Sequence, residues 1–188
     1  FVREQLPDTP IAYYIAPQQW VFSTKRDTQN IIDISDKLLA IFPDEATYYE
    51  QAGANVRWVG HPLVDILAEP MTKAQARSEL KIAADAQIVT LMPASRKQEL
   101  RYIMPVMFEA AAYIQAKQPK VRFLIPASLP DFRDEISEAA DTYELNARLL
   151  DKADGQRAIA SADLVINKSG TANFEVALMD VPQVVMYR

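Results

Sequence analysis

The segment Asn167–Glu175 (NKSGTANFE) carries residue types that can bind phosphate and ribose. Gly170 permits a tight turn or the close approach of a ligand, and the hydroxyls of Ser169 and Thr171 can cap a following helix or bind phosphate. Glu175 lies four residues after Thr171, on the same helical face, where its carboxylate can accept both hydroxyls of a ribose. The residues alone leave a second interpretation open, a capped helix with an exposed Glu175.

A second loop, Pro93–Leu100 (PASRKQEL), follows an apolar run and has complementary chemistry. The small residues Ala94 and Ser95 let the backbone approach a ligand, and the amino terminus of the next helix offers free N–H groups to an anion. Arg96 adds a planar donor suited to phosphate oxygens. The open alternative is an ordinary turn in which Ser95 caps the helix and Arg96 is solvated.

The single histidine, His61, lies in a Gly-His-Pro turn. It can face a cleft between domains or hydrogen-bond a hinge, and the turn slightly favours the hinge. Tyr13, Tyr14 and Trp20 are interpreted as packing residues rather than as a stacking platform for a ligand.

Composition excludes several classes of function. The 188 residues contain no cysteine and one histidine, which removes disulfides, thiolate chemistry and multi-histidine metal sites. The net charge of −5 is spread without a basic block, so a nucleic-acid partner is not expected. We find neither a membrane-length apolar run nor a signal-peptide pattern, and a cytoplasmic globular protein is the expectation.

The elements that must position these residues alternate between strand and helix. Such alternation is typical of parallel βαβ units, and the apolar runs suit strands buried on both faces, so an α/β doubly wound fold is predicted. Ligands then bind outside the carboxyl ends of the strands. The strands are expected at 11–15, 37–42, 56–59, 87–92, 121–125, 147–150, 164–167 and 183–187, and the helices at 25–34, 44–52, from 72, about 100–111 with Pro105 as a kink or a new start, 130–143, 154–161 and 171–179.

A change in composition and periodicity divides the chain. Residues 63–71 contain prolines and little periodicity, and they are predicted to link a domain at 1–62 to a second domain at 72–188.

Four segments together resemble the lipid-A-disaccharide synthase family of GT-B glycosyltransferases. They occur in the family's order and cover essentially the whole chain, which is more specific than any one motif. The segments are YYIAPQQW (13–20), WVGHPLVD (58–65), LMPASRKQEL (91–100) and NKSGTANFEVALMDVPQVVMYR (167–188).

The resemblance implies Rossmann-like sheets of the GT-B type, incomplete at both ends, and inverting, metal-independent transfer of a diacylglucosamine from UDP to lipid X. It implies that Ser95 and Arg96 hold the pyrophosphate, that Ser169–Thr171 line its phosphate side and that Glu175 binds the uridine ribose. His61 would lie near the cleft between the halves. The catalytic base is expected upstream of this chain, so the fragment alone is expected to be inactive.

The same resemblance implies a UDP-activated acylated glucosamine and a lipid acceptor as partners, no cofactor, peripheral association with the inner membrane, and an assembly that can be a homodimer. The sequence departs from the family pattern at Ala94, where glycine is usual, at Lys168, where a small residue is common, and after Trp20. Two alternatives are kept: a UDP-N-acetylglucosamine 2-epimerase-like enzyme, and a non-catalytic nucleotide-sugar-binding module.

Overall fold

The computed structural model describes residues 2–18, 24–127 and 129–187 and divides into two compact units, Phe1–Ile66 and Leu67–Arg188. Trp20, residues 21–23 of the segment that follows it, and Arg188 lie outside the described residues. The division falls within the predicted linker 63–71. The first half of that segment is helical, because α4 (Pro62–Ile66) begins at a proline, whose fixed φ suits the first turn of a helix.

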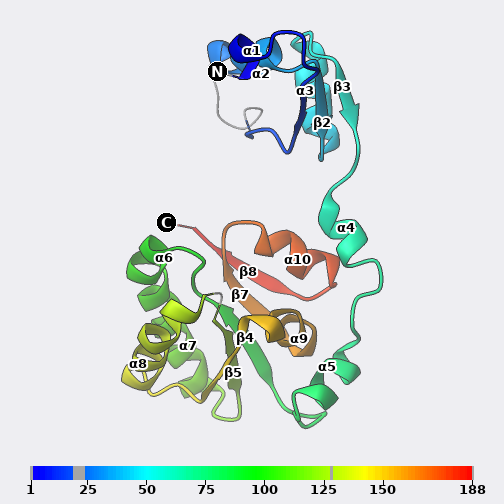
Figure 1. Cartoon of the computed structure of the whole chain (residues 1–188). Helices are drawn as coiled ribbons and strands as arrows, with labels where there is room; N and C mark the ends of the chain where they lie inside the picture. The colour runs from blue at the N-terminus through cyan, green and yellow to red at the C-terminus, as the bar shows by residue number, and fades with distance from the viewer. Residues whose placement is uncertain (1, 19–23, 128, 188) are drawn as a thin grey trace. The chain divides into compact units, whose positions relative to one another are not determined.

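The first unit contains a parallel sheet in the order β1 (Ala12–Tyr14), β2 (Lys37–Ala40), β3 (Val56–Trp58). A core of Ile31, Leu38 and Tyr49 joins the sheet to the helices α2 (Lys25–Ile34) and α3 (Pro43–Gln51). The helices of this unit are α1 (Val2–Gln5), α2 (Lys25–Ile34), α3 (Pro43–Gln51) and α4 (Figure 1).

The second unit is a five-stranded parallel sheet with helices on both faces, as Figure 1 shows. The strand order is β6-β5-β4-β7-β8, which is the doubly wound arrangement predicted from the sequence. The strands are β4 (Ile88–Met92), β5 (Arg122–Pro126), β6 (Ala147–Leu150), β7 (Leu164–Lys168) and β8 (Gln183–Met186). The helices are α5 (Lys73–Glu79), α6 (Lys97–Tyr102), α7 (Met104–Lys117), α8 (Arg133–Thr142), α9 (Gly155–Ser161) and α10 (Ala172–Leu178), with short 3-10 turns at Pro130–Phe132 and Lys152–Asp154.

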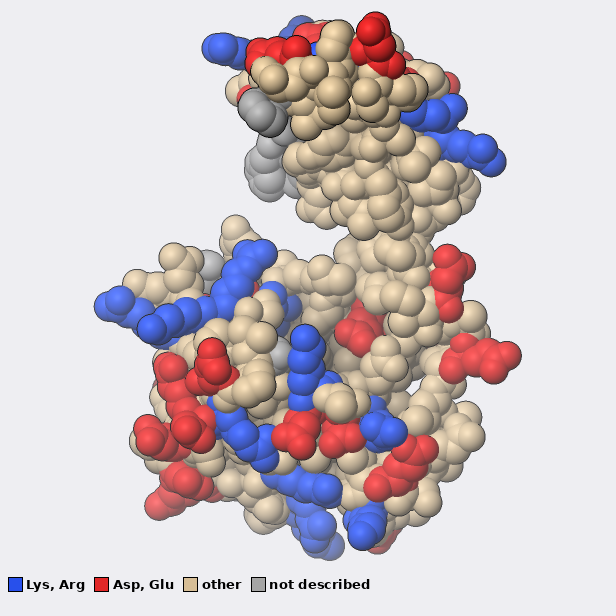
Figure 2. Space-filling view, in the orientation of Figure 1, with Lys and Arg blue, Asp and Glu red and all other residues tan. Residues whose placement is uncertain are grey.

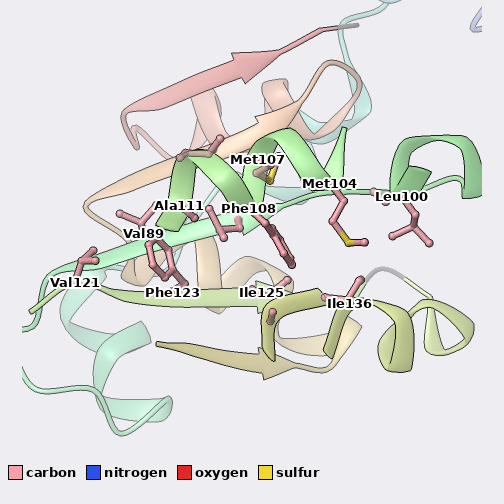
Figure 3. Close-up of a cluster of buried hydrophobic side chains, with 14 residues drawn as sticks. Val89, Leu100, Met104, Met107, Phe108, Ala111, Val121, Phe123, Ile125 and Ile136 are labelled. Carbon is pink, nitrogen blue, oxygen red and sulfur yellow. The ribbon is translucent and has the colours of Figure 1, made fainter. Parts of the chain in front are cut away.

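Two apolar cores cover the two faces of this sheet. Figure 3 shows the first, in which Phe108 of α7 meets Phe123 and Ile125 of β5. The second contains Ile159 of α9 and Val176 of α10. Because both faces are buried, the strands read as continuous apolar runs rather than as alternating patterns.

The helical pattern around Pro105 belongs to two helices. Helix α6 ends at Tyr102 and α7 begins at Met104, with Pro105 in its first turn, where the missing N–H costs no intrahelical hydrogen bond. The second of the two predicted possibilities is therefore confirmed, and α6 becomes a separate short helix beside the Pro93–Leu100 loop.

The strand order reverses direction between β4 and β7. From β4 the chain builds β5 and β6 on one side, then crosses back to build β7 and β8 on the other. The register pairs Met92 with Asn167 at the carboxyl ends of these two strands. The two loops singled out by the sequence therefore begin side by side, at the place where doubly wound folds bind ligands.

Candidate functional site

The loop after β4 is organised by Glu99, which the sequence did not single out. Its Oε2 accepts hydrogen bonds from the Ser95 backbone N–H (2.5 Å), the Ser95 hydroxyl (3.1 Å) and the Arg96 backbone N–H (3.0 Å). These two N–H groups are therefore not free for an anion, contrary to the expectation for this helix start. The N-cap position of α6 is Arg96, not Ser95, and the side chains of Ser95 and Arg96 are exposed.

The loop after β7 is joined to this carboxylate by Lys168. Its Nζ lies 3.1 Å from Glu99 Oε1, and both side chains are largely buried, at 13% and 14% exposure. Burial disfavours the charged carboxylate, but the Ser95 hydrogen bond and the Lys168 ion pair outweigh it and lower the pKa of Glu99. One carboxylate thus links both predicted loops. Lys168, which departs from the family pattern, is neither simply solvated nor free.

Both the backbone conformation at position 170 and the nearby Lys168 side chain favour glycine there. Its φ of +152° is rare for residues with a side chain, and a Cβ at this position would lie 3.0 Å from Lys168 Nζ. The close approach predicted from the sequence is therefore an approach to a lysine of the same loop.

The other predicted residues of this loop are accessible. Ser169 and Thr171 are exposed, and Thr171 occupies the N-cap position of α10 without a side-chain capping hydrogen bond because its backbone is already helical (φ −56°, ψ −30°). Glu175 is half-buried on α10. The prediction that these hydroxyls cap the helix is wrong for Thr171, so its hydroxyl is available to a ligand.

A buried polar group beneath α10 escaped sequence analysis. Asn167 is fully buried and donates from Nδ2 to Gln183 Oε1 (2.9 Å), and Gln183 donates to the Asn173 carbonyl (3.0 Å). The side-chain oxygens of Asn167 and Asn173 accept no hydrogen bond from any described residue. The one sequence signal was an asparagine closing the apolar run LVIN, and its partner Gln183 is remote in sequence.

His61 lies in the other unit, directly before α4. Its Nδ1 accepts a hydrogen bond from the Leu63 backbone N–H (3.2 Å), and its ring packs 5.3 Å from the ring of Phe42. Both contacts agree with the hinge interpretation. A position of His61 in the cleft stays a prediction.

Positive side chains gather over α6, as Figure 2 shows in the orientation of Figure 1. Arg96, Lys97 and Arg101 are exposed there. Across the described ranges, no carboxylate lies within ion-pair distance of the Arg96 guanidinium. The described part of the chain contains no cluster of side chains that could hold a metal ion and no helix that could span a membrane. The site therefore offers an unpaired guanidinium, exposed hydroxyls and a half-buried carboxylate.

Solved structures share the fold class of this chain, an α/β Rossmann-like fold of the GT-B type. UDP-GlcNAc 2-epimerase from Methanocaldococcus jannaschii matches 98% of this chain and 56% of its own with a TM-score of 0.62 at 13% identity. WaaG, a glycosyltransferase involved in lipopolysaccharide biosynthesis, matches 98% of this chain and 60% of its own with a TM-score of 0.54 at 12% identity. At these identities the likeness shows the fold alone.

Sequence comparison narrows the class to one family. Residues 1–188 match the sequence pattern of lipid-A-disaccharide synthetase, and the chain belongs to that family. The lipid-A-disaccharide synthase of Gloeothece citriformis is 50% identical over all of this chain and 49% of its own length. Those of Synechocystis sp. and Pseudomonas savastanoi are 47% and 36% identical, over 100% and 94% of this chain and 48% and 46% of their own lengths. The chain thus spans about half the length of the curated relatives it matches.

Proposed function

We propose that the whole protein transfers a diacylglucosamine from UDP to a lipid X acceptor, and that the second unit binds the UDP end of the donor. The observation that carries the proposal is the meeting of the two loops at the reversal of strand order, where Arg96 is left unpaired. Family membership supports the reaction, since the relatives are named for synthesis of the lipid A disaccharide.

In this proposal the diphosphate is bound by side chains. Glu99 already accepts from the Ser95 hydroxyl and from the Ser95 and Arg96 N–H groups, so the Arg96 guanidinium and the exposed hydroxyls of Ser169 and Thr171 are the groups left for phosphate oxygens. The Arg96 guanidinium here also stabilises the negative charge that develops on the departing UDP, without a metal. Glu175 accepts the ribose hydroxyls.

The transfer itself is an inverting displacement at the anomeric carbon. An acceptor hydroxyl forms the new C–O bond, the bond to the diphosphate breaks, and UDP leaves with its electron pair. A general base of the whole protein takes the hydroxyl proton. The lipid acceptor places the reaction at the cytoplasmic surface of the inner membrane, and a homodimer is the proposed assembly.

The decisive assay uses the full-length protein with UDP-diacylglucosamine and lipid X. Release of UDP together with disaccharide is expected. Saturable UDP binding without turnover would instead indicate a binding module, and interconversion of UDP-sugar epimers without an acceptor would indicate an epimerase.

Glu175→Ala tests the ribose assignment. It should weaken UDP binding by about 1.5–3 kcal/mol, the range for hydrogen bonds to a charged group, and leave binding of 2′,3′-dideoxy-UDP unchanged. Glu109→Ala is the matched control, because it removes an exposed carboxylate from α7. Calorimetry that finds equal losses for both nucleotides would refute the assignment.

A further inference from the structure

The ion pair between Lys168 and Glu99 differs from the exposed ion pairs of this unit. Its side chains are 13% and 14% exposed, whereas those of Arg133 and Asp151 are 44% and 79% exposed. Solvent and salt screen a largely buried pair much less than an exposed one. The Lys168–Glu99 contact can therefore hold its two loops in place.

The two carboxylate oxygens of Glu99 connect the two segments. One carboxylate oxygen contacts Lys168, the last residue of β7, and the other accepts from Ser95 and Arg96 of the loop after β4. The two loops follow β4 and β7, whose carboxyl ends are paired in the sheet register through Met92 and Asn167. The ion pair thus links the end of β7 to the chain that follows β4.

The free-energy cost of breaking the ion pair keeps Lys168 with Glu99 when an anion binds. Moving the ammonium to a phosphate would leave a largely buried carboxylate without its cation, and breaking such a pair from one side is strongly unfavourable. Arg96 is exposed and has no such partner among the described residues, so it can bind an anion without breaking a contact.

We propose that Lys168 is a positioning residue of the nucleotide pocket. Paired with Glu99, it holds the Ser95–Arg96 loop beside the Ser169–Thr171 loop and leaves the Arg96 guanidinium free for the diphosphate. The part that concerns nucleotide affinity rests on the proposed function. The part that concerns the two loops does not.

A double-mutant cycle on the full-length protein, titrated with UDP in a calorimeter, tests the coupling. Lys168→Met and Glu99→Gln should each weaken UDP binding by about tenfold, because each removes one charge-assisted contact, and the double variant should be no weaker than either single variant. Lys168→Arg should restore affinity. Lys97→Met, which removes an exposed neighbouring charge of α6, is the control and should change affinity less than twofold or so.

Additive losses of UDP binding free energy from Lys168→Met and Glu99→Gln would overturn the proposal. If Lys168 contacts the diphosphate directly, Lys168→Met and Glu99→Gln act independently and the double variant loses the product of the two factors. If Lys168 only positions the loops, the two single variants should have a higher donor KM in the transfer assay and a nearly unchanged kcat at saturating donor. A fall in kcat with KM unchanged would also contradict it.

Amide hydrogen exchange without ligand separates this proposal from the function. Both single variants should speed exchange in residues 95–97 and 169–171 together, with Lys97→Met as the unchanged control. If the parent protein fails to bind UDP but the two variants show this paired loss of protection, the proposed function falls and the holding of the loops stands. If exchange stays at the parent rate in both loops, the positioning role falls.

Discussion

The amino and carboxyl edges of the five-stranded sheet both carry a partly buried ion pair between elements distant in sequence. At the amino edge, Arg77 of α5 donates to the Ser161 carbonyl (3.0 Å) and to Asp163 (3.1 Å). Asp163 also accepts from the Ile88 backbone N–H (2.8 Å) and from Lys73. Every charge of this cluster has a partner.

The carboxyl edge pairs Lys168 with Glu99 but leaves the neighbouring Arg96 unpaired within the described residues. A cavity of about 590 Å³ opens at the other edge, lined by Lys73, Arg77 and Asp163. Since those charges are already paired, the cavity offers little to a charged ligand. Of the two charged clusters compared, the one at the carboxyl edge leaves a guanidinium without a carboxylate partner in the described part of the chain, and this supports the proposal that a nucleotide binds there rather than in the cavity.

The largest effect should come from Arg77→Met. The change leaves Asp163 without its guanidinium and two carbonyls without their donor, and we expect the free energy of unfolding to fall by about 3 kcal/mol. UDP affinity of the folded protein should not change. Chemical denaturation and calorimetry check both values, and a loss of affinity in folded protein would break the contrast between the two edges.

Arg96→Ala should show the opposite pattern. UDP affinity should fall by about 2 kcal/mol, because a charge-assisted contact to phosphate is lost, while the free energy of unfolding should change by no more than about 0.5 kcal/mol. Arg101→Ala is the matched control, since it removes another exposed arginine of α6. Equal losses from the two variants would mean that the positive field, not Arg96 itself, attracts the nucleotide.

Gly170→Ala tests the packing inside the second loop. The new methyl group meets Lys168 Nζ at 3.0 Å on a backbone that disfavours side chains, so we expect the free energy of unfolding to fall by about 1–2 kcal/mol. Gly53→Ala is a control for the backbone alone, because that glycine also has a positive φ but has nothing near its Cβ position. Equal losses in thermal unfolding would show that contact with Lys168 is unimportant.

The smallest effect is expected from acid. Burial opposes ionisation at Glu99 and Asp163, but hydrogen bonds and lysine neighbours outweigh it, and both carboxyl groups have lowered pKa values. Their stabilisation is present above the unfolded pKa of about 4 and is lost as pH falls through the lower folded pKa. We expect less than about 1 kcal/mol from each. Glu99→Gln and Asp163→Asn should each flatten the dependence of unfolding free energy on pH below about 5, and an unchanged slope would contradict the assignment.

Local patterns in the sequence were sufficient to predict the sheet and the loops at its carboxyl edge. The predicted strands 87–92 and 164–167 are short apolar runs followed by segments with small polar residues, and such signals depend on near neighbours. They predicted which loops follow the carboxyl ends of strands in one parallel sheet, and the strand order and register confirmed this placement.

The linking groups could not be predicted, because they depend on contacts between remote positions. Glu99 closes a loop that is local, but its second partner, Lys168, is brought close only by the pairing of β4 with β7. Asn167 and Gln183 meet for the same reason, across β7 and β8. A buried charge or amide cannot be distinguished from an exposed one until its partner is known.

The Lys168–Glu99 pair also constrains how this sequence can change by single mutations. Replacing the lysine first leaves a largely buried carboxylate without its cation, and replacing the glutamate first leaves a largely buried ammonium and two backbone N–H groups without their acceptor. Either order passes through a less stable intermediate, so the two positions are epistatic. Among relatives, a lysine at 168 should therefore be inherited together with a carboxylate at 99.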